Sequence, residues 1–132
     1  MRSPMASDRC VIDSSVFVAF YREVDSLHVD ALAIMREIAD ATLVVHPYVI
    51  QETTTVLAYA VGLPLAKQFL IDIGASPNVF IPPVDMQREI QSFKNVKVKI
   101  SFTDSALVAL AKDLGARLIT FDMQMLSLAR KS

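Results

Sequence analysis

Four acidic residues stand where a short apolar run meets a helix, and acidic side chains gathered at such junctions can bind a divalent cation. Asp13 ends one apolar run, and Asp122 ends another that spans residues 118–121. Glu52 lies early in a predicted helix, and Asp104 lies in the first turn of a later one. Because ligands bind at the carboxyl ends of parallel strands, we expect all four carboxylates on one rim of a sheet.

The chemistry expected of such a cluster is metal-assisted hydrolysis. Carboxylates that converge repel one another unless cations neutralise them. A ligand set made only of oxygen suits Mg²⁺ or Mn²⁺ better than zinc. These ions can activate a water molecule for the hydrolysis of a phosphodiester. The sequence has no Gly-rich phosphate loop, no His/Cys ligand set and no nucleophilic triad, so the residue types favour this reaction.

Each acid also has an ordinary structural interpretation. Asp13 and Asp122 are placed to cap the helices that follow them, and Asp104 is a favourable charge near a helix N-terminus. Glu52 is equally consistent with a solvated helix face. A phosphoaspartate receiver and a haloacid dehalogenase are weaker alternatives, because both need a second acid near Asp13, where this chain has Ser14 and Ser15. The residues alone therefore support a metal-site hypothesis.

The elements that must position these acids are short apolar strands alternating with helices. This alternation predicts an α/β fold with a parallel sheet of four to five strands between two helical layers. The predicted strands are residues 9–12, 42–45, 78–81 and 117–121, with residues 95–100 either a further strand or an extended loop. The predicted helices are residues 14–22 capped by Ser14 or Ser15, 25–38 capped by Asp25-Ser26, 47–61, 64–74, 85–93, 104–114 and 123–130. We expect one domain over residues 9–130, with residues 1–8 a flexible segment or a cloning remnant.

Composition limits the classes of function that remain. The 132 residues are 53% hydrophobic and 20% charged, which excludes a disordered chain. The net charge of -1 gives no general attraction to nucleic acid or membranes. The single cysteine lies in an apolar run, which fits a reducing compartment. Residues 1–7 are too polar for a signal peptide, and residues 56–73 are interrupted by Gly62-Leu63-Pro64, so we expect a cytoplasmic protein without a membrane span.

The order of short motifs closely resembles the PIN domain family, especially the small single-domain toxins of the VapC type. The resemblance spans about Arg9 to Arg130. The motifs that carry it are Val11-Ile12-Asp13-Ser14-Ser15, Gln51-Glu52-Thr53, Thr103-Asp104-Ser105-Ala106-Leu107-Val108-Ala109-Leu110-Ala111 and Leu118-Ile119-Thr120-Phe121-Asp122. Each motif is short, but their order, spacing and total length agree together.

The resemblance implies a Mg²⁺- or Mn²⁺-dependent endoribonuclease, the toxin of a type II toxin–antitoxin pair. The positions that match the family's acidic metal site, which would also be the catalytic residues, are Asp13, Glu52, Asp104 and Asp122. Ser14 and Thr120 match auxiliary polar positions. Many relatives carry a further acid shortly after the last one, whereas residues 123–125 are uncharged here, which leaves one metal or two open. The alternative is a catalytically inactive PIN-like scaffold that binds RNA or protein, and the intact four-acid set favours the enzyme.

Two surface features bear on partners. Lys94, Lys97 and Lys99 form a basic strip that leads to Asp104 and are candidate RNA contacts, although a solvated edge explains them equally well. Residues 47–74 are apolar over more than one helical stripe, which indicates a surface covered by a partner. Toxins of this type are usually homodimers, and a cognate antitoxin inhibits them, so both contacts are expected.

Overall fold

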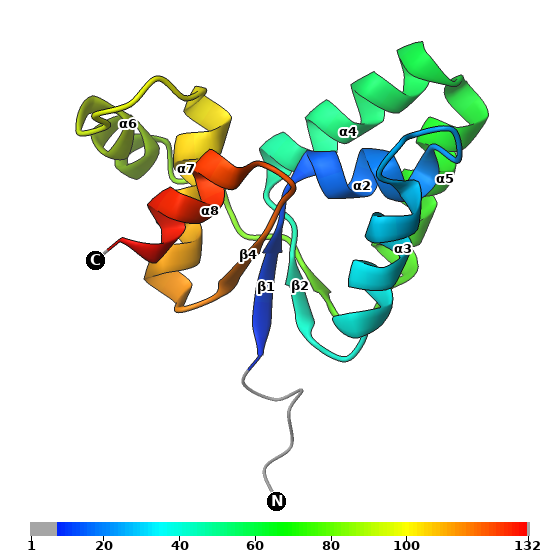
Figure 1. Ribbon diagram of the computed structural model, residues 1–132, viewed down its shortest axis with the longest axis horizontal. Helices are drawn as coiled ribbons and strands as arrows, with labels where there is room; N and C mark the ends of the chain where they lie inside the picture. Colours follow the sequence, from blue (N-terminus) through cyan, green and yellow to red (C-terminus); the bar gives the residue numbers. More distant parts are fainter. Residues whose placement is uncertain (1–7, 132) are drawn as a thin grey trace, which may run out of the picture.

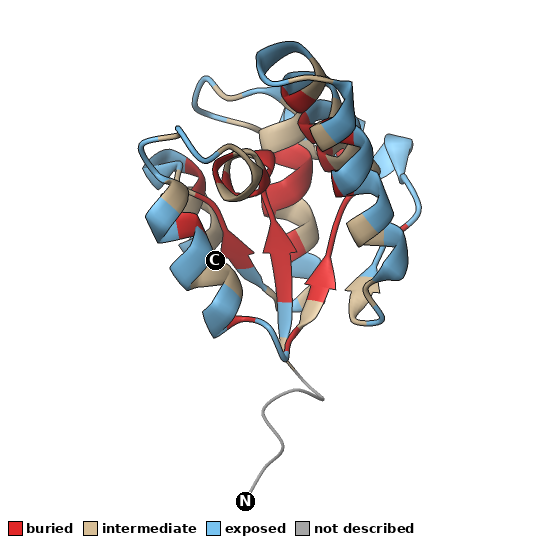
Figure 2. Ribbon diagram, turned by 90° about the vertical axis from the view of Figure 1, so that its right-hand side faces the viewer, coloured by how far each residue is buried: buried red, intermediate tan, exposed pale blue. Residues whose placement is uncertain are grey.

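A four-stranded parallel sheet forms the centre of the computed structural model, which describes residues 8–131. The strands are β1 (Arg9–Ile12), β2 (Thr42–Val44), β3 (Val79–Phe80) and β4 (Arg117–Ile119), in the order β3-β2-β1-β4. Val11 pairs with Val44 on one side and with Leu118 on the other. These central strands are the most buried part of the sheet (Figure 2).

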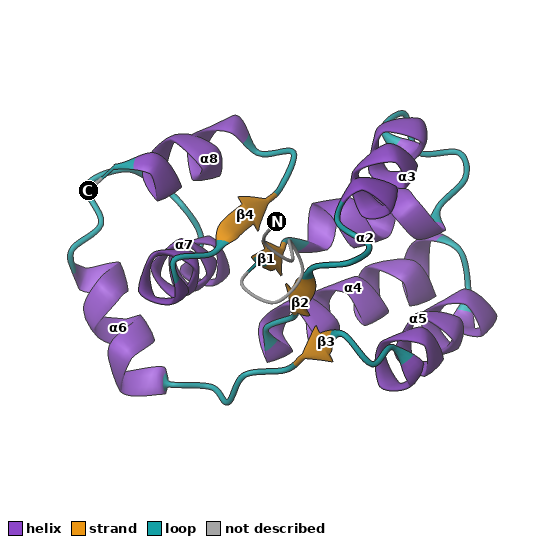
Figure 3. Cartoon of the chain, turned by 90° about the horizontal axis from the view of Figure 1, so that it is seen from below, coloured by secondary structure: helices purple, strands orange, loops and turns teal. Residues whose placement is uncertain are grey.

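Helices cover both faces of this sheet, giving the three layers that are visible in Figures 1 and 3. One layer contains α2 (Ser14–Tyr21), α3 (His28–Glu37), α4 (Pro47–Ala60) and α5 (Leu63–Ala75). The other contains α6 (Met86–Lys94), α7 (Phe102–Leu114) and α8 (Met123–Arg130). The predicted three-layer α/β fold is confirmed, with four strands. The expectation of a flexible segment at residues 1–8 falls, except for Asp8, outside the described residues.

The strand order identifies where a ligand would bind. From β1 the chain adds β2 and β3 on one side of the sheet, and β4 then pairs on the other side of β1. In open α/β sheets, ligands occupy the crevice at the carboxyl ends of the strands where the order reverses. Here that crevice lies beyond β1 and β4. The backbone amide of Asp13 donates to the carbonyl of Ile119 at 2.9 Å, which holds the two strand ends together.

Several local predictions differ from the structure. The first helix is capped by Asp13, whose carboxylate accepts from the Ser14 amide, and neither Ser14 nor Ser15 is the cap. The next helix begins at His28, because the Asp25 carboxylate instead holds the turn before it by accepting from the Leu27 amide.

Strand lengths also differ from the predictions. Residues 95–101 form a loop between α6 and α7, because this segment does not reach either edge of the sheet. The strands that end at Val44, Phe80 and Ile119 are one or two residues shorter than predicted, since pairing stops where the neighbouring strand turns into its loop or helix.

The apolar helices α4 and α5 divide into a core face and an outer face. Leu57 and Phe69 are completely buried, and the Phe69 ring packs against Phe17 and Tyr21 with centroids 5.2 and 5.6 Å away. Tyr59, by contrast, is 90% exposed. Over residues 8–131, none of the helices has the length and hydrophobicity needed to span a bilayer.

Candidate active site

Asp13 lies between the end of β1 and the start of α2, where its carboxylate is buried. Its Oδ1 accepts from the Ser14 amide at 2.8 Å. Its Oδ2 accepts from the Ser15 hydroxyl at 2.9 Å and from the Thr120 hydroxyl at 2.7 Å. A buried carboxylate requires such donors, because transfer from water without them is costly. Asp13 therefore caps the helix and is also fixed in one orientation at the mouth of the crevice.

Asp122 lies beyond β4 and is joined to Asp13 through Thr120. The Thr120 hydroxyl donates to Asp13 and accepts from the Asp122 backbone amide at 3.0 Å. The exposed Asp122 carboxylate accepts from the amides of Gln124 and Met125, which caps α8. The capping interpretation of Asp13 and Asp122 is thus correct as a description of their hydrogen bonds, and both remain at one rim of the sheet.

Glu52 extends from α4 toward the same rim. Its Oε1 accepts from the hydroxyl of Ser14 at 2.5 Å, which links α4 to the first residue of α2. Ser14 is buried, whereas Glu52 is exposed. The carboxylate is therefore held at one oxygen and open to solvent elsewhere.

Asp104 is the acid whose pKa is affected by the charges of the other three. It lies in the first turn of α7, after the N-cap residue Ser101. Burial raises the pKa of the Asp104 carboxyl, and the charges of Asp13, Asp122 and Glu52 raise that pKa further, while a hydrogen bond with Ser101 lowers it. The Asp104 carboxylate is therefore close enough to the other three acids to be repelled by their charges. This repulsion is what a bound cation would relieve.

The donor set fits a hard divalent cation, but it is not a closed cage. Among residues 8–131, no group of three or more His, Cys, Asp or Glu side chains is arranged so that it could hold a metal by itself. Mg²⁺ keeps several of its waters and commonly needs only one or two carboxylates together with substrate phosphates. An open cluster of oxygen ligands with mutual repulsion is compatible with that mode of binding.

The predicted lysine strip lies at the end of α6 and in the loop that leads to α7. Lys94 ends α6, and Lys97 and Lys99 lie in the loop that follows; all three side chains are exposed. Lys97 lines a separate cavity of about 540 Å³ between α6, α7 and α8, together with Lys112 and Lys131. No contact in the described part of the chain ties the strip to the carboxylates.

A buried network beside the cluster was not predicted from the sequence. The side chain of Glu89 on α6 accepts from the Tyr48 hydroxyl at 2.6 Å and bonds His46 Nε2 at 2.8 Å. The Tyr48 amide donates to His46 Nδ1 at 2.9 Å, so the ring proton is on Nε2 and is donated to Glu89. The hydrogen bond to Glu89 raises the pKa of Tyr48 to about 12.

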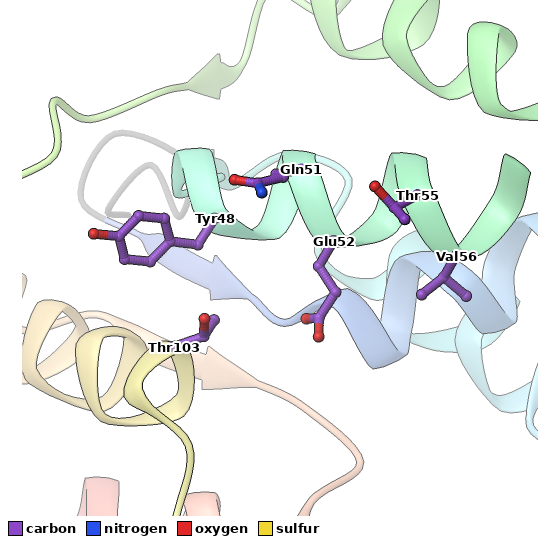
Figure 4. Close-up of a pocket in the computed structure, with 6 residues that line it drawn as sticks. All are labelled: Tyr48, Gln51, Glu52, Thr55, Val56 and Thr103. Carbon is purple, nitrogen blue, oxygen red and sulfur yellow. The ribbon is translucent and has the colours of Figure 1, made fainter.

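Little in the sequence indicates this network or its neighbours. An acid on an amphipathic helix such as α6 usually faces solvent, so the sequence does not predict that Glu89 is buried. The sequence predicts Ser15 only as a helix cap, whereas in the structure it donates to Asp13. A cavity of about 280 Å³ beside Glu52 is lined by further residues that the sequence does not mark as site residues: Tyr48, Gln51, Thr55, Val56 and Thr103 (Figure 4). All of these except Thr103, which lies on α7, share one face of α4 with Glu52, and this spacing is the available indication.

Comparisons with known proteins bear on the fold and the family. The model of the PIN domain family matches residues 10–131, which is nearly the whole chain. The crystal structure of VapC20 from Mycobacterium tuberculosis, a toxin that cleaves the sarcin-ricin loop, superimposes with a TM-score of 0.74. The two chains are 21% identical, and the match covers 89% of this chain and 93% of that one. No curated protein sequence matches the chain.

Proposed function

The chain belongs to the PIN domain family, and from this premise we propose that it is a metal-dependent endoribonuclease of the VapC toxin type. The observation that carries the proposal is the position of Asp104, whose pKa is raised by burial and also by the charges of Asp13, Asp122 and Glu52, which come from three separate parts of the chain. Mutual repulsion of this kind lowers stability, so its presence at the ligand-binding rim of the sheet supports a role in binding cations. The fold likeness to a toxin that cleaves the sarcin-ricin loop supports RNA as the substrate class.

The chain's own groups would orient the ligands and the substrate. The residues that would hold Mg²⁺ or Mn²⁺ are the four acids Asp13, Glu52, Asp104 and Asp122. When bound, the ion would supply a water of lowered pKa and would stabilise the charge on the phosphate. Thr120 and Ser15 fix the Asp13 carboxylate, and the Ser14 hydroxyl donates a hydrogen bond to Glu52. Ligands that are already oriented need no reorganisation during the reaction.

A cleavage assay with a binding readout tests this function. Wild-type protein is incubated with a labelled single-stranded RNA in Mg²⁺ or Mn²⁺, with and without EDTA. We expect cleavage only with free metal, and a loss of at least about 100-fold in Asp13→Asn and Asp104→Asn, since a metal contribution of several kcal/mol is removed. Mn²⁺ at ten times its dissociation constant should also stabilise the wild type by about 1.4 kcal/mol, and the variants by less.

Asp40→Asn is the matched control, because Asp40 is exposed and lies two residues before β2, at the opposite end of the strands. This variant should cleave and bind Mn²⁺ like the wild type. Cleavage that persists in EDTA, or full activity in both site variants, would contradict the metal-dependent nuclease. Tight RNA binding without cleavage under any metal condition would favour the non-catalytic scaffold instead.

The same proposal extends to partners. VapC-type toxins are paired with a cognate antitoxin, and we propose that this chain is inhibited by one and acts as a homodimer. The exposed apolar residues of α4 and α5 support a protein contact, since Tyr59 is 90% and Leu63 61% exposed. Co-expression with a cognate antitoxin should relieve any toxicity of the wild type, and Asp13→Asn alone should be non-toxic.

A further inference from the structure

The cavity beside Glu52 lies between α4 and the first turn of α7 (Figure 4). Its volume is about 280 Å³, and its walls are formed by Tyr48, Gln51, Glu52, Thr55, Val56 and Thr103. Five of these residues follow the spacing i, i+3, i+4, i+7 and i+8, so they lie on one face of α4. Since Glu52 is both a wall of the cavity and a member of the acidic cluster, a molecule in the cavity would lie next to the reacting phosphate.

The chemistry of the walls excludes a phosphate and suits an uncharged polar ring. No lining residue is basic, and the one charged group is the Glu52 carboxylate, which would repel a phosphate. The amide of Gln51 provides both donors and an acceptor, and the hydroxyls of Thr55 and Thr103 provide either. The Tyr48 ring and Val56 add apolar surface. Flat apolar faces with hydrogen-bonding edges are the features of a nucleobase.

Tyr48 is fixed at both ends, so its ring forms a rigid wall. Its hydroxyl donates to Glu89 at 2.6 Å, and its backbone amide donates to His46 at 2.9 Å. His46 and Glu89 are both buried and bond each other at 2.8 Å. A side chain that is already ordered loses little entropy when a ligand contacts it.

We propose that this cavity binds the base of the nucleotide adjacent to the phosphodiester that is cleaved, and that Gln51 reads the hydrogen-bonding edge of that base. The proposal rests on the proposed ribonuclease function and names the part of the substrate that gives it sequence preference. RNA-binding proteins obtain specificity mainly from unstacked bases held against side chains in this way. The volume lies just below the roughly 300–1,000 Å³ of sites for larger small molecules, which suits one base.

The test measures base preference, with binding as a second readout. Short oligoribonucleotides with one cleavable phosphodiester are varied at the base on either side of it, and kcat/KM is measured for the wild type, Gln51→Leu and Thr55→Val. Both residues are exposed, so the fold should be retained. We expect the wild type to prefer one base on one side, and Gln51→Leu to lose about 5- to 150-fold on that base and little on the others. Gln91→Leu, an exposed glutamine on α6 outside the cavity, should match the wild type.

The outcomes separate this inference from the ribonuclease function. If the wild type cleaves and both cavity variants keep its base profile and its kcat/KM, the cavity does not bind the base and the ribonuclease function stands. If the wild type does not cleave, equilibrium binding of the same oligoribonucleotides in EDTA decides the inference alone. Affinity that depends on the base and is lost in Gln51→Leu supports the cavity, and equal affinities overturn it.

Discussion

Hydroxyl groups, rather than other charges, hold the acidic rim of the sheet in place at the scale of single residues. Asp13 accepts hydrogen bonds from the hydroxyls of Ser15 and Thr120, and Glu52 accepts one from the hydroxyl of Ser14. A positively charged partner in these positions would compete with a metal ion by neutralising the carboxylates, whereas a hydroxyl donates a hydrogen bond without adding charge. The arrangement orients the carboxylates without neutralising them.

Among these hydroxyl residues, substitution of Thr120 should have the largest effect on stability and activity. Its buried hydroxyl donates to Asp13 and accepts from the backbone amide of Asp122. We expect Thr120→Val to lower the free energy of unfolding by about 1–3 kcal/mol, since it leaves a buried carboxylate without one donor at unchanged shape. RNA cleavage should fall with it. Urea denaturation and the cleavage assay measure the two effects.

Thr120→Ser serves as the control, because it keeps the hydroxyl and removes one methyl group. It should retain most of the cleavage activity and lose roughly 1 kcal/mol or less. A valine variant as stable and as active as the wild type would show that the hydroxyl does not orient Asp13.

At the scale of elements, α6 is attached to the site by one buried acid. Most of α6 is exposed, and Glu89 is its buried residue, held by His46 and Tyr48 at the start of α4. α6 also packs against α7, where the ring of Phe93 lies 5.6 Å from that of Phe102 and Arg88 pairs with Asp113. Glu89 therefore fixes α6 and also the Tyr48 wall of the cavity.

Removal of the Glu89 side chain should loosen α6 before the rest of the domain. We expect Glu89→Ala to lower the free energy of unfolding by about 1–3 kcal/mol, because His46 and Tyr48 lose their buried acceptor. Amide hydrogen exchange over residues 86–94 should accelerate more than exchange in β1 or α7.

The matched variant on the same helix is Gln91→Ala, at an exposed position. It should leave the free energy of unfolding within about 0.5 kcal/mol of the wild type, and hydrogen exchange over residues 86–94 unchanged. Unchanged exchange in Glu89→Ala would mean that the ring and ion-pair contacts suffice to hold α6.

At the scale of the whole molecule, exposed apolar side chains lie along α4 and α5. The exposed residues there, outside the cavity, are Tyr59, Val61, Leu63, Leu70 and Ile71. In this domain the core is already filled by residues such as Leu57 and Phe69 from the opposite faces of these helices. Exposed apolar surface of this extent is typical of a protein–protein contact.

A single charge in this face should prevent dimer formation. We expect the wild type to be a dimer by light scattering at micromolar concentration, and Leu63→Glu to be a monomer, because Leu63 is 61% exposed and a buried unpaired carboxylate is costly at an interface. Ile90→Glu, at a residue 43% exposed on α6, is the control and should remain a dimer. A monomeric wild type would exclude the homodimer and leave the face to another protein.

The sequence predicted the elements well because their determinants are local. Apolar runs, proline at the start of α4 and Gly115 at the end of α7 each act within a few residues of where they stand. The sequence leaves alternatives open where local choices are nearly equal: Asp13, and not Ser14 or Ser15, caps α2, and residues 95–100 form the loop and not the strand. Pairing depends on the rest of the sheet, so no local pattern determines it.

By itself, the sequence determined which residues could serve as metal ligands and that they follow strand ends, because residue type and chain order are properties of the sequence. Only the tertiary structure decided that β4 pairs beside β1, which brings Asp122 and Thr120 to Asp13 across more than a hundred residues. It alone also buried Glu89 against His46 and formed the cavity beside Glu52. These features depend on contacts between helices far apart in the chain, and side-chain packing in three dimensions, rather than local propensity, selects them.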